Sequence, residues 1–218
     1  MKKQNYFYLL VAGMVSVLVL CACSKQQTPK TTNINTSLAF ISMDCKAVGE
    51  FNILDISKIP EVAKAINETK SLPYVKEAIK VGLDISSIST ICIGIEIPAT
   101  VSQEKEDINN SNGIVIVSTK ADLNIDTFIK LAEKNAKDMS FKDTMIDNSK
   151  AYMFKSTNPA TSKQEEIYIT QLNSKLVAIG TLKEIKDAIS LKNGKGKSVL
   201  DNTELAKISN NFSLKNMF

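Results

Sequence analysis

The sequence predicts an α+β domain, in which a mainly antiparallel β-sheet has amphipathic helices covering one face. Three observations lead to this prediction. Apolar side chains recur every three to four residues in several segments, as they do on one face of an α-helix. Other segments are short and rich in β-branched and aromatic residues, which is typical of strands. The last four of these follow one another through short polar connections, which favours an antiparallel meander.

The first half of the chain predicts three strands and two helices. A short apolar run at 37–43 is typical of a strand, and apolar residues at helical spacing predict helices over 60–70 and 71–84. Residues 86–97 alternate isoleucine with small or polar side chains, so we expect a half-buried strand with its isoleucines on one side. The continuous apolar run at 113–119 predicts a strand buried on both faces.

The second half predicts one helix, four strands and two closing helices. In chain order these are the helix 124–139, the strands 140–147, 150–156, 165–171 and 175–181, and the helices 182–193 and 198–210. Each half contains a strand pair and an amphipathic helix, so residues 37–218 form either one α+β domain or two small subdomains. The chain stops without a clear closing element, so a C-terminally incomplete domain is a further alternative.

The basic residues limit the chemistry that this chain can perform. All 27 of them are lysines, and histidine, arginine and tryptophan are absent. Without histidine the chain lacks the usual general base near neutral pH and the commonest zinc ligand. Without arginine it lacks the bidentate partner of carboxylates and phosphates. The 23 acidic residues are interspersed with the lysines and no basic stripe appears, so we expect no nucleic-acid partner.

The N-terminus has the layout of a secretory signal peptide over residues 1–22. Two lysines precede an apolar segment from about residue 6 to residue 20, shorter than the roughly 20 apolar residues that comfortably span a bilayer. The segment ends in Leu20-Cys21-Ala22-Cys23. This ending resembles the lipobox of bacterial lipoproteins, in which leucine stands three residues before the lipidated cysteine and a small residue directly before it. An uncleaved membrane anchor and an ordinary secretory signal are the alternatives.

The resemblance to lipoproteins implies that Cys23 carries the lipid and begins the mature chain. Cys21 fits the acceptor position poorly because bulky Leu20 precedes it, so it leaves with the signal peptide. Two or more acyl chains hold a protein stably at a membrane. Residues 23–36 are polar and lack periodicity, which is typical of a flexible tether. Because Ser24 follows the cysteine, the family implies the outer membrane where the cell has one, and otherwise the outer face of the cytoplasmic membrane.

The exported region resembles, in its layout, uncharacterised lipoprotein ectodomains. In these a strand, a helix and a hairpin precede a helix led by glycine and serine, and this chain has GKGKSVLDNTEL at that place. The resemblance brings no catalytic residue with it.

One segment has the oxygen spacing of a calcium-binding loop. Its side chains at loop positions 1, 3, 5 and 12 are Asp122, Asn124, Asp126 and Glu133. Thr127 stands where the loop needs glycine, and Lys130 would repel a cation. We therefore expect no metal site, and predict instead that Asn124 or Asp122 caps the following helix and that Asp126 faces its positive end.

Two other segments match known motifs only in part. Residues 192–198 end like a phosphate-binding loop but lack its first glycine and follow a helix, so we predict a helix stop at Gly194 and a cap by Ser198 with Asp201. Ser102 and Lys105 have the spacing of a serine acyl-enzyme, but they lie in a polar loop where the lysine keeps its proton.

Cys45 and Cys92 are the two cysteines of the exported region. In an exported protein such a pair can be a disulfide, and both lie on or beside predicted neighbouring strands. Each can equally be a small buried apolar residue. The sequence leaves the alternatives open, because the bond requires Cα atoms within about 7 Å of each other.

These observations favour a lipid-anchored cell-envelope protein that is not an enzyme and acts as a binding or scaffold module. We expect no cofactor, a membrane contact through the lipid, and an envelope protein as partner, met by the polar loops 99–113 and 156–166. The alternatives are a carrier of an apolar ligand and a hydrolase that works without histidine. A deep apolar cavity would favour the carrier, and a filled core would favour the interaction module.

We predict that Cys23→Ala abolishes membrane retention or leaves an unprocessed precursor, because it removes the thiol that the lipid joins. Cys21→Ala is the control, since alanine suits the middle of the lipobox, and it should anchor normally. Membrane fractionation with intact mass measurement tests both variants. A shortened Cys23→Ala chain that still extracts with the membrane would contradict the assignment.

Overall fold

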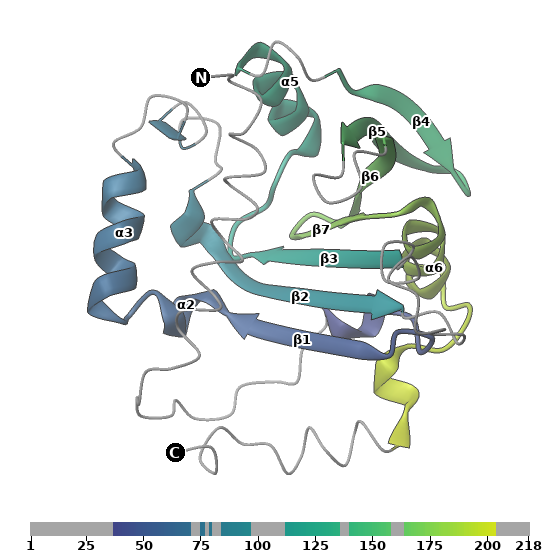
Figure 1. Ribbon diagram of the computed structural model, residues 1–218. Coiled ribbons are helices and arrows are strands. Elements are labelled where there is room, and N and C mark those ends of the chain that lie inside the picture. The colour runs from purple at the N-terminus through teal and green to yellow at the C-terminus, as the bar shows by residue number, and fades with distance from the viewer. Residues whose placement is uncertain are drawn as a thin grey trace.

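Seven strands form one continuous antiparallel sheet in the computed structural model (Figure 1). The structure describes residues 37–70, 75–76, 79, 84–96, 112–135, 140–157 and 164–203. The signal peptide predicted at 1–22 and the tether predicted at 23–36 lie outside these residues. The α+β class and the mainly antiparallel sheet predicted from the sequence are confirmed.

The described elements are strands, three long helices and several short helical turns. The strands are β1 (Ala47–Asn52), β2 (Ile88–Glu96), β3 (Asn112–Thr119), β4 (Lys142–Ile146), β5 (Ser149–Thr157), β6 (Gln164–Asn173) and β7 (Leu176–Gly180). The long helices are α3 (Pro60–Lys70), α5 (Ile125–Asn135) and α6 (Leu182–Lys192). The short turns are η2 (Leu38–Phe40), α2 (Ile53–Ile56), η3 (Ile85–Ser87) and η5 (Val199–Asp201).

The sheet consists of two meanders joined side by side, in the order β1-β2-β3-β7-β6-β5-β4. Strands β1 to β3 form the first meander and strands β4 to β7 form the second. They meet where β3 pairs with β7, from Ile114 opposite Gly180 to Ser118 opposite Leu176. The two halves that echo each other in the sequence are thus joined through a continuous ladder of backbone pairs.

The helices that follow the two meanders lie on opposite faces of the sheet. Helix α6 packs on one face, in a cluster that includes Ile114, Ile116, Ala178, Ile185, Ala188 and Ile189. Helix α5 packs on the other face, in a cluster made of Ile125, Ile129, Tyr152, Phe154, Ile169 and Val177. Neighbouring strand residues such as Val177 and Ala178 point to opposite faces, so the sheet is apolar on both sides. Helix α6 thus covers one face as expected, while the cover by α5 was not predicted.

The prediction of a first strand at 37–43 is wrong. This segment forms the turn η2 and an isolated bridge between Ser42 and Ser198, whereas the first strand is β1. The reason is packing, because Ile41 is fully buried in the cluster under α6, and its carbonyl accepts the Val199 N–H at 2.9 Å. The apolar residues Ala47, Val48 and Phe51 of β1 do not alternate regularly with polar ones, which is why the sequence pattern missed the strand.

Most other elements agree with the sequence prediction within a few residues. These are α3, α5, α6 and the strands β2 to β7. Strands β4 and β5 are joined by Asp147 and Asn148, whose φ angles of 45° and 62° are those of a two-residue hairpin turn. In the helix predicted at 71–84, the described residues Val75, Lys76 and Ile79 are helical. The helix predicted at 198–210 begins with η5, and its part beyond residue 203 lies outside the described residues.

The two faces of strand β2 differ in burial near its C-terminal end. The face that carries the small residues Cys92 and Gly94 is buried more deeply than the face that carries the isoleucines. Cys92 is fully buried, whereas Ile95 is 38% exposed. The missing side chain of Gly94 makes the space for this packing, since a Cβ there would lie 2.7 Å from Ile41 Cγ2 and 3.0 Å from Cys45 Sγ. The side that the alternation marks as apolar is therefore not the side on which α6 packs.

We predict that Gly180→Ala lowers the free energy of unfolding by about 2 kcal/mol, because overpacking a tight backbone contact has a cost of this order. A Cβ at Gly180 would lie 2.5 Å from the Gly113 carbonyl oxygen, at the junction of the two meanders. Gly113→Ala is the matched control, since its Cβ would meet nothing closer than the Gly94 oxygen at 3.6 Å. Urea unfolding of both variants measures the difference, and equal midpoints would contradict the prediction.

Candidate functional site

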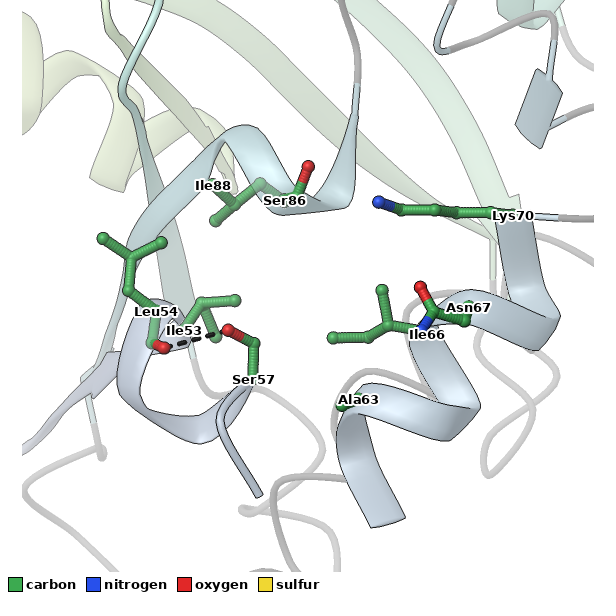
Figure 2. A pocket seen from close by; sticks show the side chains of 9 residues that line it. All are labelled: Ile53, Leu54, Ser57, Ala63, Ile66, Asn67, Lys70, Ser86 and Ile88. Atoms are coloured by element: carbon green, nitrogen blue, oxygen red, sulfur yellow. Dashed lines mark hydrogen bonds between the residues drawn. The ribbon is translucent and has the colours of Figure 1, made fainter. Parts of the chain in front are cut away.

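An open cavity of about 170 Å³ lies between α2, α3 and the beginning of β2 (Figure 2). Its lining is formed by Ile53, Leu54, Ser57, Ala63, Ile66, Asn67, Lys70, Ser86 and Ile88. Four of these residues carry large aliphatic side chains, which come from three different elements. Ligand pockets usually measure about 300 to 1,000 Å³, so this cavity is small.

The polar groups at the mouth of the cavity are engaged with one another or with the backbone. Figure 2 shows Lys70 extended toward Ser86. The Lys70 Nζ lies 3.4 Å from Asp84, which also accepts the hydroxyl and the backbone N–H of Ser86. Burial opposes ionisation of Asp84, but the bonds from Ser86 and the charge of Lys70 lower its pKa. The Ser57 hydroxyl donates to the Leu54 carbonyl at 2.9 Å. The cavity can therefore hold an apolar group of side-chain size, with no general base in its lining.

A second group of polar residues gathers at the N-terminus of α6. Glu184 is 1% exposed, and its Oε2 lies 3.9 Å from the Sγ of Cys45. The Lys183 Nζ lies 2.8 Å from Glu96 Oε2 and 3.8 Å from Glu184 Oε1. The Asn112 side chain also donates to Glu96, at 3.1 Å. Four separate parts of the chain thus meet around one buried carboxyl group.

The two carboxyl groups of this cluster have pKa values shifted in opposite directions. Burial raises the pKa of Glu184, although Lys183 opposes that shift. Hydrogen bonds from Lys183 and Asn112 lower the pKa of Glu96. Such a split is typical of acid and base pairs in enzymes. Here, however, Glu184 is sealed beneath protein atoms, so of the two carboxyl groups only Glu96 reaches the surface.

Sequence analysis missed Glu184, although a signal was present. In α6 it shares the buried face with Ile185, Ala188 and Ile189, where helical spacing predicts an apolar residue. An acidic side chain at such a position is unusual, because burying a charge is costly unless it is paired or protonated.

The structure records Cys45 and Cys92 as free, buried thiols in the same core cluster. This arrangement corresponds to the second alternative drawn from the sequence, a pair of small buried residues. Burial raises the pKa of each thiol to about 12, with the neighbouring Glu184 adding to the shift at Cys45 and Glu50 at Cys92. Both thiols stay protonated near neutral pH and are poor nucleophiles.

The four oxygen-bearing residues of the calcium-like segment have separate partners. Asn124 caps α5 by accepting the Thr127 N–H at 3.1 Å, as predicted. Asp126 accepts from Tyr152 at 2.7 Å and from Lys150 at 3.0 Å, and these bonds lower its pKa. Asp122 accepts the Ser174 hydroxyl at 2.8 Å, and Glu133 accepts the Phe141 N–H at 3.2 Å. The segment thus anchors α5 to the second meander.

The remaining motif residues have structural roles or lie outside the described residues. Gly194 follows α6 with a φ of 72°, and Ser198 forms a reciprocal cap with Asp201, so both predictions are confirmed. Ser102, Lys105 and the lipidation candidate Cys23 lie outside the described residues.

Comparison of the chain with known protein families, with curated proteins and with solved structures finds no match. Among the described residues, no helix is both long and apolar enough to cross a membrane.

We predict that Cys45 and Cys92 are both alkylated when the protein is denatured without a reductant, and that both are protected in the folded protein. Burial and the raised pKa values account for the protection. Peptide mapping by mass spectrometry identifies the modified cysteines. Absence of both adducts in the denatured, unreduced sample would show that the disulfide forms instead.

Proposed function

We propose that the chain is a lipid-anchored cell-envelope protein that acts by contact, as a non-catalytic binding or scaffold module. The lipid on Cys23 would hold it at the outer membrane, or at the outer face of the cytoplasmic membrane in a cell without an outer membrane. The polar segment 23–36 would let the domain reach a protein partner away from the lipid surface. The observation that carries the contact role is the filled space between the sheet and α6.

That space is occupied by the protein's own side chains. Ile41, Ile116, Ile185 and Ile189 are each fully buried in one cluster. A carrier of an acyl chain or a similar ligand needs an apolar cavity at such a place, and the cavity beside α3 holds about 170 Å³. The filled core therefore supports a protein that contacts its partner through its surface, and it argues against a carrier that holds an apolar ligand in its interior.

The hydrolase alternative rests on the carboxyl pair formed by Glu96 and Glu184. A carboxyl pair can catalyse hydrolysis without histidine, but both groups must reach the substrate. Glu184 is 1% exposed, and the Lys183 ammonium occupies the space beside Glu96. This burial supports a structural role for the pair.

The contact surface proposed from the sequence consists of the loops 99–113 and 156–166. Their central parts, 97–111 and 158–163, lie outside the described residues. The loops connect β2 to β3 and β5 to β6, so each leaves from paired strands of the sheet. A rigid base of this kind lets a loop vary without disturbing the core.

We predict that replacing residues 99–111 and 158–163 with Gly-Ser turns removes crosslinks to an envelope protein in intact cells. The matched control replaces the β4–β5 turn residues Asp147 and Asn148 with Asn-Gly, which keeps the turn geometry. The control should retain the crosslinks of the wild type. An unchanged set of partners in the loop variant would end the loop proposal, and turnover of peptidoglycan or an ester by the purified protein would end the non-catalytic one.

We predict further that no apolar compound copurifies with the membrane-extracted protein. Native mass spectrometry tests this for the wild type and for Ala63→Leu, which fills the cavity, with the exposed Ala65→Leu in the same helix as control. The carrier alternative requires a bound compound that is lost in Ala63→Leu and kept in Ala65→Leu.

A further inference from the structure

Helix α6 begins with the spacing of a capping box that is not formed. Thr181 is the N-cap residue and Glu184 follows three residues later, so each side chain could accept the backbone N–H of the other residue. The chain builds such a box at Ser198 and Asp201. At α6, by contrast, the Thr181 side chain makes no capping bond, and its N–H donates to the Gly113 carbonyl at 3.2 Å.

Two buried oxygens are left over by this arrangement. Within the described part of the chain, Thr181 Oγ1 and Glu184 Oε1 are the buried side-chain atoms without a hydrogen-bond donor. An unpartnered buried oxygen is costly, and these are the two oxygens that a capping box would use. The same residues therefore have a second arrangement in which both would be satisfied.

The surroundings of Glu184 favour a protonated carboxyl group. It faces Cys45 from the segment before β1, Glu96 from the end of β2, and Lys183 and Asp187 from its own helix. Strands β3 and β7 and the turn η2 bring no ionisable side chain, and Tyr168 of β6 bonds its hydroxyl to Glu166. The Lys183 ammonium lies 2.8 Å from Glu96 Oε2 and 3.8 Å from Glu184 Oε1, so the two carboxyl groups share the surroundings of one lysine, and they repel each other when both are ionised. A proton on Glu184 removes this repulsion.

We infer that Glu184 is a proton-controlled latch, which holds the first turn of α6 against the ends of β2 and β3 and releases into a capping box with Thr181 when it loses its proton. The ionised carboxylate would leave Glu96 and Cys45 for the positive end of the helix dipole, where it accepts the Thr181 N–H. That N–H then no longer bonds to Gly113, so the junction between β3 and α6 loosens. This device is independent of the lipid anchor and of the proposed contact function.

The protonation state of Glu184 decides how the stability of the fold changes with pH. Burial raises the pKa of Glu184 above its ordinary value of 4.5. The latch is therefore fully closed below that value, and its stabilisation is lost as the pH rises through the raised pKa. Between these two pKa values the folded state holds one proton that the unfolded state has lost, so the folding constant falls by about tenfold per pH unit.

Unfolding by denaturant from about pH 4 to about pH 9 tests the latch on the full chain in detergent. Glu184→Gln keeps the shape of the side chain without a titrating proton, so the ratio of the wild-type folding constant to that of the variant should fall as the pH rises. Glu61→Gln makes the same chemical change at an exposed first-turn position of α3, and it should follow the wild type. Parallel pH profiles of the wild type and Glu184→Gln would overturn the inference.

Alkylation of Cys45 gives a second readout that does not depend on global unfolding. Release of Glu184 should expose Cys45, so its labelling relative to the buried Cys92 should rise several-fold with pH in the wild type and stay constant in Glu184→Gln.

Thr181→Ala keeps the inference testable if Glu184→Gln does not fold. It should leave stability at acidic pH unchanged and reduce the alkaline labelling of Cys45. A loss of stability at acidic pH would show that Thr181 already caps the helix, and would overturn the inference, as would a constant labelling ratio in the wild type.

Discussion

The pairing of β3 with β7 is the constraint on which the rest of the structure depends. It joins the two meanders into one sheet. It also brings the backbones of Gly113 and Gly180 so close together that position 180 has no room for a side chain. Both core clusters contain residues of this pair, Ile114 and Ala178 on one face and Val177 on the other. Helix α6 begins directly after β7, so the same pairing decides which face of the sheet α6 covers and where its buried Glu184 lies. Without this ladder there would be two small sheets, each with one unpaired apolar edge.

Local patterns were sufficient for most of the individual elements. The helical spacing of apolar residues in α3, α5 and α6, and the short connections between β4 and β7, are properties of contiguous segments, and the structure agrees with them. The errors arose where a distant partner decides the outcome. Residues 37–43 look like a strand until Ile41 is seen packed beneath α6, and β1 is a strand chiefly because β2 pairs with it. The position of α5 on the second face of the sheet likewise depends on the direction in which the chain continues after β3.

The chemistry of the candidate site was less predictable than the fold. The helix caps at Asn124 and Ser198 could be predicted, because a capping bond joins residues three positions apart. The carboxyl cluster joins Cys45, Glu96 and Glu184, which are separated by long stretches of chain, so no local motif marks it. The cavity beside α3 has the same origin, since its walls come from α2, α3, η3 and β2, which approach one another only in the folded domain. The lipidation site proposed at Cys23 differs from both, because a linear motif carries its whole signal and no described residue takes part in it.

The order of strands in the sheet also has a consequence for how the chain is made. Synthesis proceeds from the N-terminus, so β3 is complete at Thr119 while its neighbour β7 begins only at Leu176. During that interval the first meander presents a long apolar strand with unpaired backbone groups at its open side. Contacts between such distant segments form slowly, and they form last in a chain that emerges from a narrow exit. The edge of β3 in a nascent chain of this design therefore stays open until β7 is made.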